Sequence, residues 1–166
     1  MNHAQLNTRY KAWADDVFLS AISALPTEAL TTPQPIIFGN LIRTLNHVCM
    51  MDHVWRCHLL GQPHGLTTRN PEPCPALEEL ATRQREMDAW YVHYADQMSD
   101  IDLAKKVTFD FIGGGSGRMS RLAILLHVVN HGCYHRGHVA GMLYQSGVAP
   151  PTTDLPVFLR EQSQDV

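Results

Sequence analysis

The chain has 166 residues, of which 45% are hydrophobic and 17% are charged, and its formal net charge is -3. This length suits one domain over residues 1–166 with a substantial buried core. The nearly balanced charge excludes the basic surface of a nucleic-acid-binding protein and the composition of a disordered acidic chain. We therefore expect a small-molecule partner and no nucleic acid.

The N-terminal residues lack a basic stretch followed by an apolar one, and no run approaches the roughly 20 apolar residues of a membrane span. These features favour a cytoplasmic protein that does not enter a membrane. None of the cysteines forms a Cys-x2-Cys pair, so we expect free thiols at all four positions: Cys49, Cys57, Cys74 and Cys133. Cys133 points away from the neighbouring histidines on a helix, which favours a packing role.

Two amphipathic helices are predicted in the first part of the chain. The first spans His3 to Ala24, where apolar residues recur at steps of three and four; these are Leu6, Tyr10, Trp13, Val17 and Ala21. The second begins after the N-cap Asn40 and ends at Leu60, before Gly61. Its expected buried face carries Leu41, Leu45, Val48, Met51, Trp55 and Leu59.

The following segment, Gln62 to Pro75, is proline-rich and is predicted to be a loop. A third helix follows from Ala76 to Met98, and its apolar period includes Leu80, Met87, Tyr91 and Tyr94. Residues 106–112 alternate as a short strand, residues 113–117 form a glycine-rich turn, and the fourth helix spans Ser120 to Gln145. The apolar tail 154–161 is expected to lie back on the body.

This order of elements predicts an all-α fold, a four-helix bundle with a short β-like excursion before the last helix. The long loop between the second and third helices leaves room for a crossover connection.

The fourth helix carries four histidines on one face, at His127, His131, His135 and His138. Residues four apart are neighbours on a helix, and these four fall within an arc of about 80°, so two or three rings can point at one cation. A pair spaced in this way is expected about once by chance in a chain with this histidine content, so the spacing needs support from its context.

A catalytic zinc-type site needs three protein ligands and an open position, so a third ligand must come from a facing helix. The candidates are His47, His53 and His58; His47 lies at the edge of the buried stripe, whereas His53 is expected to face solvent. The chain has no Glu-x2-His of a di-iron bundle, no His-Glu-x2-His of a zinc protease and no Gly-x-Ser-x-Gly of a serine hydrolase.

Three segments carry a resemblance to the DinB/YfiT-like family. They are His47-x4-Asp52-x2-Trp55, then Asn130-His-Gly-Cys-Tyr-His135-Arg-Gly, then the tail Val157-Phe-Leu-Arg-Glu161. The resemblance implies a four-helix bundle that holds a divalent metal (zinc, nickel or iron) through His47, His131 and His135, and often a homodimer. It also implies low-molecular-weight thiols as co-substrates of characterised relatives. The sequence departs from the family pattern at His138, where glutamine is frequent.

The preferred interpretation is a metal-dependent enzyme in which the ion activates a thiol or a water. Thiol S-transfer and metal-assisted hydrolysis stay open, as does a non-catalytic metal-binding or stress-response module in which His138 closes the coordination shell. A weaker alternative is a helical interaction protein whose histidines belong only to the core.

Several residues neighbour the three histidines. His127 is expected to pack beside the site, and Asn130 and Tyr134 to flank it. For Asp52 we favour a surface carboxylate over a residue that orients a histidine or pairs with Arg136, and for Arg136 a structural ion pair. We expect Gly132 and Gly137 to let the second helix approach closely enough to deliver His47; Gly141 also lies in this helix.

Overall fold

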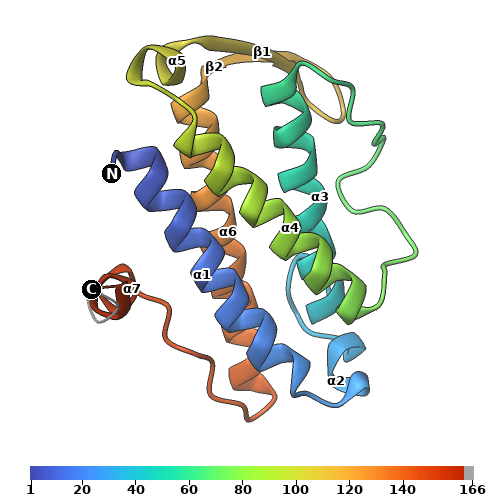
Figure 1. Cartoon of the computed structure of the whole chain (residues 1–166). Coiled ribbons are helices and arrows are strands. Elements are labelled where there is room, and N and C mark those ends of the chain that lie inside the picture. Colours follow the sequence, from blue (N-terminus) through green and yellow to red (C-terminus); the bar gives the residue numbers. More distant parts are fainter. Residues whose placement is uncertain (163–166) are drawn as a thin grey trace.

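The computed structural model describes residues 1–162 and is mostly helical. Its four long helices are α1 (His3–Ser23), α3 (Leu41–Leu60), α4 (Leu77–Asp96) and α6 (Arg121–Gln145). α1 and α6 run in one direction, whereas α3 and α4 run in the other (Figure 1). α1 and α3 each pack against both α4 and α6, which closes the bundle. The predicted all-α four-helix bundle is confirmed.

The predicted crossover lies between α3 and α4. Residues 61–76 run back along the outside of the bundle, so that α4 begins at the same end as α3 (Figure 1). Both predicted boundary residues of α3 are confirmed: the Asn40 side chain accepts a hydrogen bond from the Arg43 amide, and Gly61 ends the helix with φ 66°. The crossover therefore starts at a glycine-ended helix.

Short elements close the two ends of the bundle. α2 (Thr27–Thr31) lies at one end, and α5 (Asp100–Ala104) lies at the other, beside an antiparallel hairpin of β1 (Lys106–Asp110) and β2 (Ser116–Ser120). The predicted strand of residues 106–112 is confirmed over 106–110, and the predicted turn of residues 113–117 is confirmed over 113–115. The sequence did not predict α2 or α5, because a five-residue helix is too short to show a hydrophobic period. It also missed β2, which begins at Ser116, inside the predicted turn of residues 113–117.

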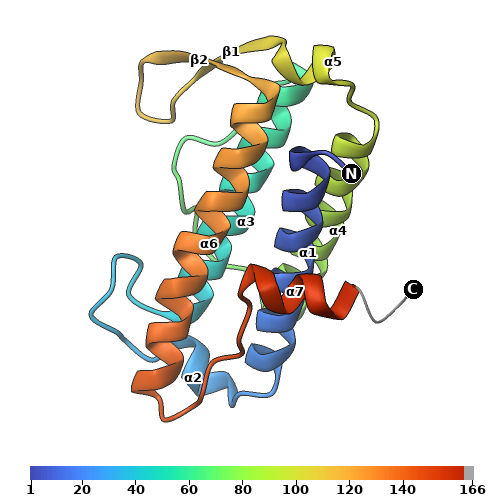
Figure 2. The same cartoon turned by 90° about the vertical axis from the view of Figure 1, so that its left-hand side faces the viewer.

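The C-terminal helix α7 (Leu155–Gln162) lies across α1 (Figure 2). Phe158 is buried there, with its ring centroid 6.0 Å from that of Tyr10 and 5.5 Å from that of Trp13. The prediction that the tail returns to the body is therefore confirmed. Within residues 1–162, none of the helices combines the length and the apolar character that a membrane span requires.

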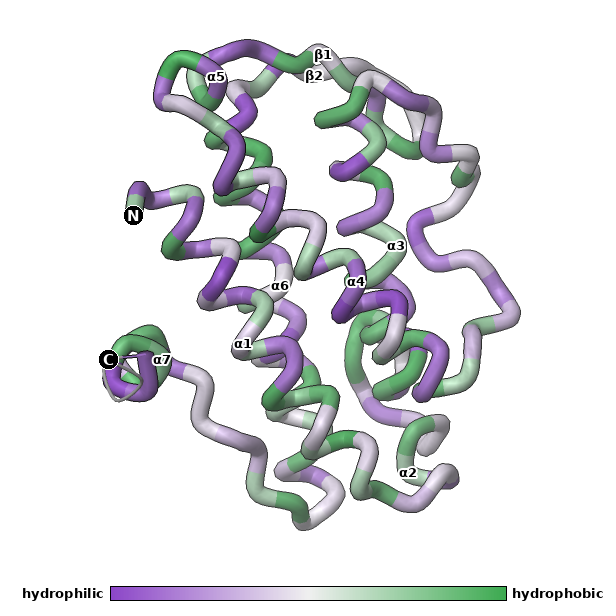
Figure 3. The backbone as a smooth tube through the Cα atoms, in the orientation of Figure 1, coloured by the Kyte–Doolittle hydropathy of each residue, from purple (hydrophilic) through white to green (hydrophobic). Residues whose placement is uncertain are grey.

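The apolar core is divided into two clusters along the bundle axis. One includes Trp55, Tyr91 and Phe109 near the hairpin, and the other includes Phe18 and Leu143 near α2. Figure 3 shows hydrophilic and hydrophobic segments alternating along the long helices, as helices with one buried face require. Buried polar side chains on all four helices occupy the middle layer between the clusters: Lys11, Asp15, His47, Asp52, Gln84, Asp88, His135 and Arg136.

The buried face predicted for α1 was wrong, because a different side of the helix faces the core. The five apolar residues of the predicted stripe are only partly buried, and two of them, Tyr10 and Trp13, face α7. The face that is fully buried carries Ala4, Thr8, Lys11, Ala14, Asp15, Phe18, Leu19 and Ile22. The buried charges interrupt the hydrophobic pattern, so the pattern indicated the seam with α7 instead of the core.

The expected role of the α6 glycines was also wrong. A Cβ atom on Gly132 would lie 3.2 Å from Cε of Lys11, so this glycine permits close approach of a side chain from α1 and not of α3. A Cβ atom on Gly137 or Gly141 would meet nothing within 4 Å. The delivery of His47 to α6 therefore does not depend on these glycines.

Candidate metal centre

The bundle brings together the three histidines that the sequence singled out. His47 comes from the middle of α3, and His131 and His135 come from adjacent turns of α6, the helix against which α3 packs. The Nε2 atoms of His47 and His131 are 3.2 Å apart, and one nitrogen from each of the three rings lies within 4.8 Å of the others. Within residues 1–162, no other group of three histidine, cysteine or acidic side chains is arranged in this way.

The crossover loop holds the His47 ring in place. The His47 Nδ1 atom lies 2.9 Å from the carbonyl oxygen of Arg69. Because a carbonyl oxygen can only accept, His47 Nδ1 is the donor of this hydrogen bond. The proton therefore resides on Nδ1, and the Nε2 lone pair is directed toward His131. Phe38 stacks on the other side, with ring centroids 4.2 Å apart. Sequence reasoning missed Arg69 and Phe38, since neither belongs to a motif or a periodic helix face.

The three imidazoles are neutral near pH 7. Burial and the neighbouring His135 and His47 rings lower the pKa of His131 to about 3, and burial and His47 lower that of His135 to about 4. Burial also lowers the pKa of His47. Because a metal ligand must be a neutral imidazole, this environment presents the rings in the form that binds.

The buried nitrogens of this cluster are incompletely paired. The Nδ1 atoms of His131 and His135 are buried and have no hydrogen-bond partner among the described residues. In His131, however, the nitrogen that faces His47 is Nε2 and not Nδ1, so the unpaired Nδ1 atom is not the candidate ligand. Three neutral imidazoles from two facing helices are a donor set that fits a divalent transition metal.

The other two histidines of α6 lie outside the set of three. The His127 ring packs against Trp55, with centroids 4.7 Å apart, in agreement with its predicted packing role. The His138 ring lies 5.2 Å from that of His135 and 4.4 Å from that of Tyr134. It is not one of the residues whose nitrogens converge. Asn130 and Tyr134 are exposed beside the site, the latter by 61%.

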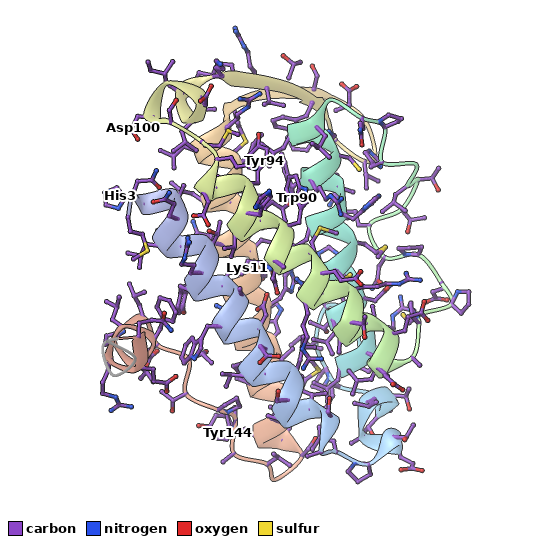
Figure 4. The ribbon with its side chains drawn as sticks, in the orientation of Figure 1. His3, Lys11, Trp90, Tyr94, Asp100 and Tyr144 are labelled. Carbon is purple, nitrogen blue, oxygen red and sulfur yellow. The ribbon has the colours of Figure 1, made fainter. Side chains whose placement is uncertain are left out.

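Asp52 is buried, and the prediction of a surface carboxylate at this position was wrong. Its exposure is 0%, its Oδ2 atom lies 2.8 Å from Nζ of Lys11, and the Gln84 amide donates to it. The same Lys11 ammonium contacts Asp15 and Asp88 (Figure 4 labels Lys11 on α1). The spacing on α3 indicated only that Asp52 points away from His47. The sequence of α3 cannot show that a buried lysine on α1 lies opposite Asp52.

The predicted ion pair of Arg136 is confirmed. Its Nη1 atom donates to Oδ1 of Asp15 at 2.6 Å, while Nη2 contacts the sulfur of Cys133. Arg136 therefore pairs with Asp15 and not with Asp52, and through Asp15 it joins α6 to the buried ion pairs of Lys11. The four cysteines are free, and Cys133 faces Tyr10 on α1 instead of the histidine cluster.

A cavity of about 290 Å³ opens beside the histidine cluster. His47 and His131 form part of its lining, together with Trp55, Phe109 and Arg69. This volume is near the lower end of the range for small-molecule sites. A small molecule could thus reach the nitrogens of the cluster from the side of the hairpin.

Comparison with known proteins supports the sequence resemblance. The model of the DinB family matches residues 1–166. Protein DinB of Bacillus subtilis is 26% identical over 156 residues, which covers 90% of each chain. A DinB-like protein from Bacillus cereus has a TM-score of 0.67 at 22% identity, covering 87% of this chain and 91% of that one. A conserved protein from Enterococcus faecalis has a TM-score of 0.58 at 14% identity, covering 86% and 95%. These two structures bear on the fold alone.

Proposed function

Because the chain belongs to the DinB family, we propose that it is a metal-dependent enzyme that acts as one domain on a small molecule. His47, His131 and His135 hold the ion in this proposal. The observation that carries it is the convergence of three neutral imidazole nitrogens within 4.8 Å. A cavity of about 290 Å³ beside them provides access for a substrate.

The chain's own residues prepare this site. The Arg69 carbonyl fixes the tautomer of His47, and the Phe38 ring covers the same imidazole. A divalent ion held by three histidines with an open position would supply a Lewis acid that lowers the pKa of a water or thiol. The protein's contribution is to exclude bulk water from one side of the cluster while leaving the cavity side accessible.

The reaction that we favour is transfer of a low-molecular-weight thiol to an electrophile, with hydrolysis at the same site as the alternative. Zinc, nickel and iron all suit imidazole ligands. To separate the two reactions, the zinc-loaded chain is supplied with glutathione or cysteine and with monobromobimane as the electrophile, and product is compared with that formed in water alone. Consumption that is independent of added thiol would contradict the transferase assignment.

A non-catalytic metal-binding module is the rival function. It requires a fourth protein ligand, and His138 is the nearest further histidine, with its ring 5.2 Å from that of His135. X-ray absorption of the zinc-loaded protein counts the imidazole ligands. Three imidazoles together with an exchangeable ligand support the enzyme, whereas a closed set of four, lost in His138→Ala, supports the module.

Metal titration of variants tests the ligand set. His47→Ala, His131→Ala and His135→Ala are each expected to weaken zinc binding by at least about a hundredfold, because two histidines leave an incomplete donor set. His53→Ala is the matched control, since this half-buried residue lies on α3 outside the cluster. Elemental analysis after purification gives the occupancy. Zinc content that survives all three cluster variants would overturn the proposal.

We also propose that the protein is a homodimer. Large apolar side chains are exposed on the outer side of α6, including Tyr134 at 61% and Tyr144 at 69%. A second copy that covers this face would remove them from water. Analytical ultracentrifugation of the wild type and of Tyr134→Glu tests this: the wild type is expected to sediment as a dimer and the variant as a monomer.

A further inference from the structure

We infer that the cavity between the histidine cluster and the β hairpin is a binding site for a small aromatic carboxylate. In this assignment the ring lies against Trp55 and Phe109, and the carboxylate binds the Arg69 guanidinium. The inference deepens the proposed function, because it names the substrate class of the same site, and it rests on that proposal. Its binding component, however, is measurable without a metal.

The apolar wall of the cavity is rigid. The rings of Trp55 and Phe109 meet edge to face, with centroids 4.8 Å apart, and the two residues are only 9% and 5% exposed. On the opposite strand, a Cβ atom at Gly117 would lie 2.6 Å from the Phe109 ring, so only glycine lets β2 pass this close. A preformed aromatic wall of this kind favours a flat ring, which it can contact at little entropic cost.

The cationic side of the cavity is supplied by the crossover loop. Arg69 is the only lysine or arginine in the lining, and its Nη2 atom donates to the Ile112 carbonyl at 3.3 Å. Across residues 1–162, no carboxylate lies within ion-pair distance of this guanidinium. Its remaining donors are therefore available for a planar anion, and a carboxylate matches their geometry in a bidentate manner.

The one acidic residue in the lining is Asp110, and it forms no ion pair with Arg69. Burial and His64 lower the pKa of His58, and the nearby Asp110 partly offsets this effect. One arginine and no second cation suit a singly charged carboxylate better than a phosphate.

Arg69 also connects the anion site to the histidine cluster. Its carbonyl oxygen accepts the His47 hydrogen bond, while its side chain lines the same cavity. A carboxylate bound at the guanidinium would therefore be placed by the same loop residue that orients His47. Substitution of the side chain leaves the backbone carbonyl in place, so carboxylate binding and metal binding are separable by mutation.

The test compares two probes of matched shape, 3-phenylpropanoate and its neutral amide, by calorimetry on the full chain in metal-free and zinc-loaded forms. Metal-free wild type is expected to bind the carboxylate about tenfold more tightly than the amide. Arg69→Gln is expected to abolish this preference and Arg69→Lys to restore part of it. Arg118→Gln, an exposed arginine on β2, is the control and is expected to retain the full preference. Zinc affinity is measured on every variant.

The outcomes separate this inference from the proposed function. Equal binding of the two probes by the wild type, or a preference that survives Arg69→Gln, would overturn the carboxylate site even if zinc binds normally. Tighter binding of phenyl phosphate than of 3-phenylpropanoate would overturn the substrate class. Absence of zinc binding with an intact, Arg69-dependent carboxylate preference would overturn the metal proposal alone.

Discussion

The histidine cluster and the Lys11 network share the middle layer of the bundle, but the buried polar groups are neutral in the first and charged in the second. The histidines are neutral, and two of them keep a buried nitrogen without a partner among the described residues. The Lys11 network is built from full charges that neutralise one another: Lys11, Asp15, Asp52, Asp88 and Arg136. The histidine cluster brings together ring nitrogens that are available to a ligand, whereas the Lys11 network uses its charges in ion pairs that join the helices.

The balance of charge within the Lys11 network explains its titration. Two cations face three carboxylates, so full ionisation would leave one uncompensated negative charge in the core. Burial raises the pKa of Asp88 to about 7, although Lys11 opposes the shift. In Asp15, by contrast, Lys11 and Arg136 outweigh burial, and the pKa is lowered. Burial also raises the pKa of Asp52. One proton held by Asp88 or Asp52 therefore keeps the network close to neutral.

The largest expected effect comes from removing the central cation. Lys11→Met keeps the length of the side chain but leaves three buried carboxylates without their shared partner, and we expect a loss of about 3–5 kcal/mol in the free energy of unfolding. Urea denaturation measures this loss. Arg85→Met is the control, because the exposed Arg85–Asp16 pair joins the same helices, α4 and α1, and is expected to contribute less than about 1 kcal/mol. Equal effects of the two substitutions would mean that the Lys11 network does not stabilise the bundle.

Asp88→Asn is expected to change how stability depends on pH. Because the folded-state pKa of about 7 lies above the ordinary value of 3.8, the contribution of Asp88 is fully present below about pH 3.8 and is lost as the pH rises through 7. Asparagine does not titrate, so the stability of the variant relative to the wild type is expected to rise by more than about 1 kcal/mol between pH 4 and pH 7.5. Denaturation curves at fixed salt across this interval would show it; parallel curves would place the proton elsewhere.

The histidine cluster and the Lys11 network also differ in how far the sequence could predict them. His131 and His135 lie at a helical spacing that is visible within one short segment of the chain, so the sequence alone pairs them. The Lys11 network depends on contacts between residues that are 77 and 121 positions apart, such as Lys11–Asp88 and Asp15–Arg136. No local sequence pattern indicates such contacts. The buried charges on α1 also led to the wrong prediction of which face of this helix is buried.

The fold was predictable where helices are long and one face is apolar. The buried face of α4 agrees with its hydrophobic period at Leu80, Met87 and Tyr91. The buried face of α3 agrees at Met51 and Trp55. What surrounds the histidines was not predictable, since Arg69 and Phe38 come from loops and act on His47 through a backbone carbonyl and a ring face. These contacts exist only once the crossover loop has closed against α3.

A smaller effect on stability is expected at Gly132, which lies between the histidine cluster and the Lys11 network. Gly132 follows His131, and an added Cβ would lie 3.2 Å from Lys11, which three aspartates hold in place. We expect Gly132→Ala to lower the free energy of unfolding by about 1 kcal/mol despite the better helix propensity of alanine. Gly137→Ala is the matched control, and there the open space predicts a gain of up to about 1 kcal/mol. A gain at both positions would show that Lys11 can move.

The smallest expected effect concerns zinc binding at mildly acidic pH. Protons compete with a metal for imidazole nitrogen only near the pKa of the ring, and burial brings the pKa of His131 to about 3 and that of His135 to about 4. Burial also lowers the pKa of His47 from 6.5. The zinc dissociation constant at pH 5.5 is therefore expected to exceed its value at pH 7.5 by no more than about tenfold, as measured against a chelator calibrated at both pH values. An increase of a hundredfold or more on acidification would mean that more than one ring titrates near the ordinary value of 6.5. The histidine rings would then be as hydrated as surface side chains, and the histidine cluster would no longer be a buried polar group like the Lys11 network.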